Sequence, residues 1–230
     1  MLDTSIHVRI PDPNLGDYAV ACKNFTWHDV DHCFSWHTTG RINIAHEAID
    51  RHADNPAFAD RTCLRYVHLS KSFAITYRQM RDLSNRFANV LTGLGIQKSD
   101  RVCLFLPGIP ELYIAMVGCA KIGAIIVPLY GDYMTGAVKS RMFDARPKAV
   151  ITDSARLSRI PLQELPGLEH VIIAGEGQGH DTRYRHWEKE MARASENFEP
   201  LWLEPDTPFL IVYTSGHDGS RSGLCMFTRP

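Results

Sequence analysis

The chain has 230 residues, of which 44% are hydrophobic and 22% are charged, and this ordinary globular composition argues against a disordered or coiled-coil protein. Lysine and arginine total 25 against 26 aspartates and glutamates, which excludes the strongly basic surface that nucleic acid or an anionic membrane would attract. The six cysteines contain no C-x-x-C pair, so the sequence predicts reduced thiols and a cytoplasmic protein.

Residues 1–40 are predicted to form an irregular N-terminal segment, because Pro11, Pro13 and Gly16 interrupt any early element. The first residues also lack the apolar core of a secretory signal. Four residues of the segment have a spacing that would allow zinc binding on a helix: His28, His32, Cys33 and His37. Packing of an aromatic- and histidine-rich stretch explains them as well, and we predict no metal site.

Residues 41–216 are predicted to form an α/β domain. Its first helix begins near Ile42 and places Ala45, Ile49 and Ala53 on one face, and short strands follow within residues 57–77.

The next helix has the clearest signals in the chain. Thr76 and Gln79 have capping-box spacing at its start, and Gly95 suits the position after its end. Its apolar stripe comprises Met80, Leu83, Phe87, Val90, Leu91 and Leu94. Arg78, Arg81 and Arg86 lie off this stripe, and we expect them on a solvated face.

Strands and helices then alternate with short connections. Continuous apolar runs predict buried strands at Val102–Leu106, Ala124–Leu129, Ala149–Thr152, Leu168–Ala174 and Phe209–Tyr213. Helices are predicted at Pro110–Ile122, Gly136–Ala145 and Thr182–Ala194. The alternation indicates a doubly wound, mostly parallel sheet, in which ligands bind beyond the carboxyl ends of the strands.

The most apolar window, Ile109–Leu129, has two interpretations. It could span a membrane, but it contains Glu111, Lys121 and two prolines. We therefore favour a buried helix followed by a buried strand.

The strongest candidate site follows the last predicted strand, where Tyr213 leads into Thr-Ser-Gly-His-Asp-Gly. Glycine amides and hydroxyl groups at the carboxyl end of a parallel strand can cradle a phosphate. The alternative is a tight turn after a core strand. The loop is not a Walker A motif, because G-x-x-x-x-G-K-[ST] is absent.

Tyr213-Thr-Ser-Gly216 resembles the start of the signature of the adenylate-forming (AMP-binding) enzymes, and the chain upstream is similar to the acyl-CoA synthetase branch, most of all to acetyl-CoA synthetases. The similarity runs from about Phe25 to Gly216. The segments that carry it are Phe25–Trp27, Phe34–His37, Asn43–His52, Thr76–Tyr77, Asp100–Val102, Pro110–Leu112, Lys121–Ala124 and Pro128–Leu129.

This resemblance implies the N-terminal subdomain of an adenylate-forming enzyme and a ligase that joins acetate or another short carboxylate to coenzyme A. ATP is cleaved to AMP and diphosphate through an acyl-adenylate, so ATP, Mg²⁺ and coenzyme A are the implied cofactors. The resemblance assigns Thr214, Ser215, Gly216 and Gly219 to ATP binding. Nucleic-acid and membrane partners are not expected.

Residues 217–230 depart from the family pattern. His217 and Asp218 replace a hydroxyl pair, and Arg221 and Ser222 replace Pro-Lys. An aspartate repels phosphate, by about 1 kcal/mol at 4 Å in water and by more when desolvated. Codons for residues 223–230 read in another frame can encode a segment like the family's own, so we hypothesise a frameshift near Gly216.

A second hypothesis follows from the length of the family's proteins. The acyl pocket, the acidic metal-binding motif and the C-terminal adenylation lysine of the family have no counterpart in these 230 residues. We therefore predict no catalytic residue within the chain, and an inactive fragment or residual nucleotide-binding module as the alternative function. An uncovered edge of the last strand is expected to favour aggregation or pairing with a second chain.

Overall fold

The structure is a computed structural model, and it describes residues 16–26, 28–69, 71–175, 181–215 and 221–227. The chain forms two units, Met1–Thr39 and Gly40–Pro230, which are described separately. The first unit contains three short helices, α1 (Tyr18–Asn24), α2 (His28–Asp31) and α3 (Trp36–Thr39). Asp17 caps α1 by accepting hydrogen bonds from the amides of Ala19 and Val20. Helical turns therefore occur in a stretch that we expected to be irregular.

The second unit begins with a helical segment, and its predicted buried face is confirmed. The segment consists of η1 (His46–Asp50), a π-helical turn, and α4 (Arg51–Ala53). All four apolar residues predicted for the inner face are buried: Ile42, Ala45, Ile49 and Ala53. Ile42 itself forms an isolated antiparallel bridge with Leu203, which fixes the start of the unit.

A two-stranded antiparallel hairpin, β1 (Thr62–His68) and β2 (Lys71–Thr76), leads into α5 (Tyr77–Gly93). The capping box is present, because the Gln79 amide donates to Thr76 Oγ1 at 3.2 Å and the Thr76 amide donates to Gln79 Oε1 at 2.9 Å. Gly95 follows the last turn with a φ of +76°, a conformation that glycine adopts without strain. Both helix boundaries are thus set by local sequence.

The main sheet has seven strands in the order β7-β6-β5-β3-β4-β8-β9. The strands are β3 (Arg101–Phe105), β4 (Ile125–Pro128), β5 (Ala149–Asp153), β6 (His170–Ala174), β7 (Tyr184–His186), β8 (Pro208–Ser215) and β9 (Arg221–Phe227). All neighbouring pairs are parallel except β8 with β9. The predicted α/β class and the mostly parallel sheet are therefore confirmed.

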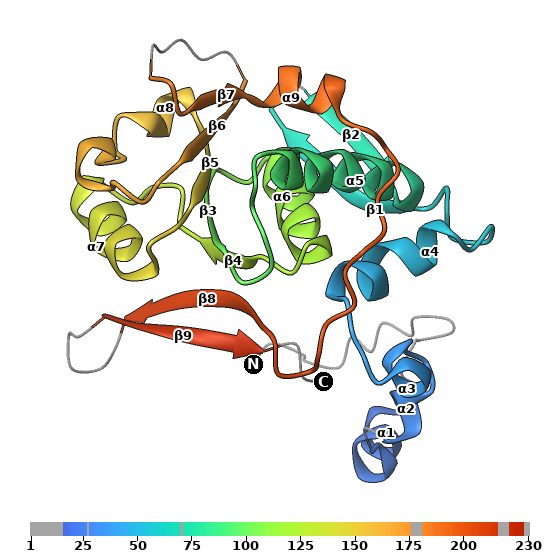
Figure 1. The fold of residues 1–230 in the computed structure, drawn as a ribbon. Coiled ribbons are helices and arrows are strands. Elements are labelled where there is room, and N and C mark those ends of the chain that lie inside the picture. Colours follow the sequence, from blue (N-terminus) through green and yellow to red (C-terminus); the bar gives the residue numbers. More distant parts are fainter. Residues whose placement is uncertain (1–15, 27, 70, 176–180, 216–220, 228–230) are drawn as a thin grey trace, which may run out of the picture. The chain divides into compact units, whose positions relative to one another are not determined.

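Helices cover both faces of this sheet, as Figure 1 shows. The elements that complete the fold are α6 (Pro110–Lys121), α7 (Thr135–Ala145), α8 (Ser154–Leu157), η2 (Leu162–Glu164) and α9 (Trp187–Arg193). One core cluster joins α5, α6 and α9 to the sheet face that includes Val102 and Leu104. The other joins α7 to the opposite face, which includes Cys103 and Phe105. The alternation of β3 residues between two apolar clusters explains why its sequence is continuously apolar.

The apolar window at Ile109–Leu129 forms α6 followed by β4, both largely buried, as the favoured interpretation predicted. None of the helices in the described ranges combines the length and apolar composition that crossing a bilayer requires.

One prediction about the C-terminal third was wrong in detail. Residues 182–194 are not one helix, because Tyr184–His186 pair with β6 as strand β7 before α9 begins. The last predicted strand is paired along one side by β9, and on its other side it meets β4 at the single pair Ile126–Leu210. β9 is the outer strand within the described residues. The exposed apolar side chains of this region are those of Leu224, Met226 and Phe227 on β9.

Candidate functional site

The loops after β3 and β4 enclose a cleft at the carboxyl edge of the sheet. The chain passes from β3 to β4 on one side and later returns to β5 on the other side of β3, so the direction of winding reverses there. Sheets of this kind bind ligands at such a reversal, beyond the carboxyl ends of the strands. The cleft has a volume of about 370 Å³ and is lined by residues 106–108 and 128–132 together with Leu112 and Arg156.

Arg156 organises one wall of this carboxyl-edge cleft. Its Nε donates to the carbonyl of Gly131 at 2.7 Å, and its Nη1 donates to Asp153 Oδ2 at 2.6 Å. Asp153 Oδ1 accepts from the amide of Arg156 and thereby caps α8. A Cβ on residue 131 would lie 3.1 Å from the guanidinium and from the Leu106 carbonyl, so glycine permits this close approach.

Arg159 supports the same loop, with Nη1 at 3.3 Å from the Gly131 carbonyl and 3.4 Å from the Tyr133 carbonyl. Two guanidinium groups thus lie where the sheet would bind a ligand. Guanidinium groups suit phosphate because they present several donors in a planar fork and stay charged at all physiological pH values. The sequence analysis missed both arginines, although their place directly after the strand Ala149–Thr152 could have identified them.

Two of the four residues predicted to bind ATP, Thr214 and Ser215, belong to β8. Thr214 is exposed near the end of β8, and Ser215 is the last residue of that strand. Gly216 and Gly219 lie outside the described residues, as do His217 and Asp218. Because β8 is parallel to β4, Thr214 and Ser215 lie at the same sheet edge as the carboxyl-edge cleft. Residues 221–227, in the divergent part of the sequence, pair with β8 as strand β9.

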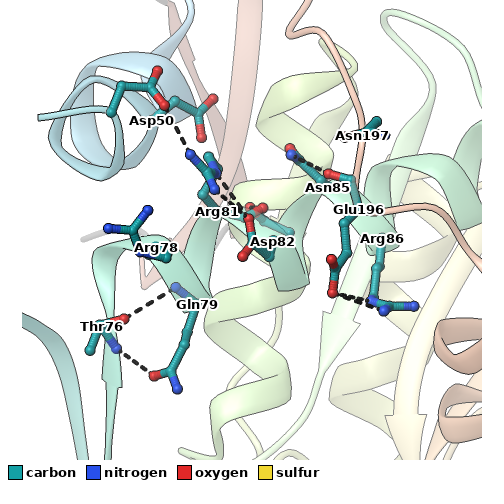
Figure 2. A network of polar contacts seen from close by, with 12 residues as sticks. Asp50, Thr76, Arg78, Gln79, Arg81, Asp82, Asn85, Arg86, Glu196 and Asn197 are labelled. Atoms are coloured by element: carbon teal, nitrogen blue, oxygen red, sulfur yellow. Dashed lines mark hydrogen bonds and ion pairs between the residues drawn. The ribbon is translucent and has the colours of Figure 1, made fainter. Parts of the chain in front are cut away.

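A second and larger cleft, of about 750 Å³, lies beside α5, and most of the charged side chains that line it are acidic. Its carboxylates are those of Asp50, Asp54, Asp82, Glu196 and Glu199, and its arginine is Arg81. Arg81 Nη1 contacts Asp54 Oδ1 at 2.9 Å, and Nη2 contacts Asp82 Oδ1 at 2.8 Å. Figure 2 shows Arg81 directed to Asp82. The excess of carboxylates makes this α5 cleft unsuitable for a polyphosphate.

Lys121 forms a buried ion pair behind the α5 cleft. Its side chain is fully buried, and Nζ donates to Asp50 Oδ1 and Asn85 Oδ1, both at 2.6 Å. Burial lowers the pKa of Lys121 and raises the pKa of Asp50, while their mutual attraction opposes both shifts. The second oxygen of Asp50 is buried without a hydrogen-bond partner among the described residues. The pair is therefore a structural one that is costly to break.

The polar face of α5 holds the chain segment that leads from α9 towards β8, which corrects the prediction of a solvated arginine face. Arg78 is exposed, but Arg86 is half-buried and donates to the carbonyls of Met191 and Ala194 and to Glu196 Oε1. Figure 2 shows this contact of Arg86 with Glu196, and Asn85 beside it. Asn85 Nδ2 donates to the Glu196 carbonyl at 2.7 Å. These side chains supply the hydrogen bonds that water would otherwise donate to the backbone carbonyls of the segment.

The described residues contain no group of three or more His, Cys, Asp or Glu side chains placed to hold a metal ion. His28, His32, Cys33 and His37 are exposed, so the packing explanation that we favoured for them is wrong. All six cysteines lie in the described ranges and are thiols rather than disulfides.

Comparisons with known proteins agree with this fold. A family model described as "AMP-binding enzyme" matches residues 46–226. An acetyl-coenzyme A synthetase of Bacillus subtilis is 38% identical over 93% of the chain and 37% of its own length. One from Methanothrix thermoacetophila is 33% identical over 82% and 31%. A Brucella canis acyl-CoA synthetase structure superposes with a TM-score of 0.80 at 26% identity, over 92% of the chain and 38% of that protein. The chain thus spans about a third of the length of these relatives.

Proposed function

Since the chain belongs to the AMP-binding enzyme family, we propose that it serves an acid–thiol ligase of the acetyl-CoA synthetase type. The similarity to acetyl-coenzyme A synthetases along nearly the whole chain carries this proposal. The substrates would be a short carboxylate such as acetate, ATP and coenzyme A, and the products an acyl-CoA, AMP and diphosphate. The thiol state of all six cysteines supports a cytoplasmic location.

The reaction would proceed in two displacements. A carboxylate oxygen attacks the α-phosphorus of ATP, and the bond to the bridging oxygen breaks to release diphosphate. The sulfur of coenzyme A then attacks the acyl carbon, and AMP leaves with the electron pair of its acyl–oxygen bond. Negative charge grows on the departing diphosphate in the first step, so donors fixed around it lower the barrier.

The carboxyl edge of the sheet supplies such donors in this proposal. Thr214 and Ser215, with Gly216 and Gly219, would contact the ATP phosphates through hydroxyl and amide groups. Arg156 and Arg159 would provide positive charge for phosphate groups of ATP or of coenzyme A. Magnesium would enter with the nucleotide, since Mg²⁺ is commonly held by substrate phosphates and one or two carboxylates.

The alternative function is nucleotide binding without ligation. Ligation is the less favoured of the two in these residues, because Asp218 and the loss of the family's lysine weaken the stabilisation of the departing diphosphate on which catalysis depends. Isothermal titration with Mg-ATP, together with acetate-dependent exchange of labelled diphosphate into ATP, separates the two functions.

Exchange that requires acetate would support ligase chemistry in these residues. Binding of Mg-ATP without exchange would support the nucleotide-binding module. If the chain shows no binding of Mg-ATP and no exchange, the assignment of the Thr214 loop to ATP is contradicted. The same titration without Mg²⁺ is the control, and it tests whether the site binds the complex of Mg²⁺ with ATP rather than ATP alone.

A further inference from the structure

The last aromatic residue of β8, Tyr213, is tied to helix α7. Its hydroxyl donates to Asp144 Oδ2 at 2.7 Å, and its oxygen also lies 3.1 Å from the Arg141 carbonyl. The shorter contact is a hydrogen bond to a carboxylate, which is stronger than a bond between neutral groups. It joins two elements 69 residues apart in the chain, immediately before Thr214.

Arg141 lies beside this contact and is itself unusual. It is 7% exposed, and its guanidinium lies 4.1 Å from the ring centroid of Tyr133 and 5.6 Å from that of Tyr213. Nη1 donates to the Ala137 carbonyl, and Nε has no hydrogen-bond partner within the part of the chain that the structure describes. Stacking on two tyrosines fixes the cation next to the end of β8.

Gly223 of β9 makes room for the arrangement. It is the hairpin partner of Tyr213. A Cβ at residue 223 would lie 3.2 Å from Tyr213 Cε1 and 3.3 Å from Asp144 Oδ2. These separations are tighter than ordinary van der Waals contact, so a side chain there would require the ring and the carboxylate to shift by a few tenths of an ångström. Glycine at this position therefore protects the Tyr213–Asp144 bond.

We propose that Asp144 is a positioning residue for phosphate binding. It acts through the hydroxyl of Tyr213 to fix the orientation of Thr214 at the end of β8. This inference rests on the proposed function, because it requires that Thr214 contacts a nucleotide phosphate. The two stacked tyrosines and Arg141 restrain the Tyr213 ring, and Asp144 restrains its far end. A strand end held at both points cannot rotate Thr214 away from the sheet edge without breaking a charged hydrogen bond.

The test compares variants that remove only this bond. Tyr213→Phe keeps the stacked ring and Asp144→Asn keeps the size of the side chain, so both are expected to fold. Tyr184→Phe, on β7 at the opposite end of the sheet, is the matched control. The affinity for Mg-ATP is measured by isothermal titration, and the thermal midpoint of each variant is recorded alongside. We expect Tyr213→Phe and Asp144→Asn each to weaken binding about tenfold, the double variant to weaken it no further, and Tyr184→Phe to change it less than twofold.

Each other outcome decides against the inference. If the wild-type chain binds Mg-ATP and the two variants bind it equally well, the bond is structural and the positioning role is wrong while the proposed function stands. An equal loss in Tyr184→Phe leads to the same conclusion. If the wild-type chain binds no nucleotide, the assignment of the loop to ATP fails and the positioning role fails with it. Gly223→Ala provides an independent check, since it should reproduce the tenfold loss with both bonding partners present.

Discussion

The carboxyl-edge cleft and the α5 cleft differ in what surrounds their arginines. At the carboxyl edge, Arg156 donates to a loop carbonyl and to Asp153, beside a second guanidinium from Arg159. In the α5 cleft, Arg81 is held between Asp54 and Asp82 and is outnumbered by carboxylates. The larger cleft is thus the less suitable one for a phosphate substrate. The carboxyl-edge cleft contains Asp132 beside Arg156, and its place at the end of parallel strands is what makes it the site that we propose for a phosphate ligand.

We expect the carboxyl-edge cleft to bind the ligand and the α5 cleft to stabilise the fold. Side chains at the carboxyl edge should affect ligand binding more than folding. Those around α5 should affect folding more than binding, because they join α5, α6 and the segment before β8 through buried and partly buried hydrogen bonds. A variant at the carboxyl edge that lowers stability without lowering ligand affinity would contradict this expectation. A variant in the α5 cleft that lowers affinity without lowering stability would contradict it as well.

The largest effect is expected from Lys121→Met. The substitution leaves the Asp50 carboxylate buried without its cation, and removing one partner of a buried pair costs about 3–5 kcal/mol. That is a large part of the total stability of a typical domain. The free energy of unfolding is measured by urea denaturation, and any remaining folded protein should bind Mg-ATP as the wild type does.

The double variant Lys121→Met with Asp50→Leu is the control for this prediction. Replacing both charges with apolar side chains of similar volume is often neutral for stability, so most of the loss should be recovered. If the double variant is as unstable as the single one, the ion pair is not the source of the loss. If Lys121→Met keeps its stability and loses nucleotide affinity, the α5 region takes part in ligand binding and our assignment of a stabilising role to it is wrong.

The second effect compares Arg156→Gln with Arg81→Gln. Each variant removes one guanidinium that makes two contacts, but only Arg156 lies at the carboxyl edge. Loss of a charged contact to phosphate should weaken binding of Mg-ATP or of coenzyme A about tenfold, equivalent to about 1.4 kcal/mol. Arg81→Gln should leave both affinities unchanged. Titration of each variant with each ligand makes the comparison, and equal affinities for Arg156→Gln and the wild type would remove Arg156 from the site.

Much of the fold could be predicted because its signals are local. Thr76 and Gln79 begin α5 through bonds to each other's backbone, and Gly95 ends it by adopting a positive φ. The strands of the parallel sheet were recognisable because residues such as Val102 and Cys103 are buried on opposite faces of one strand. No partner distant in the chain is needed for either conclusion.

The errors arose where distant contacts decide the structure. Tyr184–His186 have a helical pattern in the sequence, but pairing with β6 draws them into the sheet. Arg86 looks like a solvated residue of α5 until the chain at 191–196 returns to cover it. The same applies to the candidate site. Arg156 became part of it only when the return of β5 beside β3 placed α8 next to Gly131.

The smallest expected effect is the pH dependence that His52 gives to the stability of the fold. Burial against Tyr77 and Phe58, followed by the charge of Arg51, lowers the pKa of His52 below 6.5. The unfolded chain therefore binds a proton at His52 more readily than the folded protein does, so the stability is fully present above pH 6.5 and is partly lost as the pH falls through the folded pKa. Urea unfolding of the wild type and His52→Gln at pH 7.5 and 5.5 measures this, and the stability advantage of the wild type should shrink at the lower pH. A larger advantage at pH 5.5 would mean that the carboxylate of Glu47 stabilises the imidazolium more than burial and Arg51 oppose it.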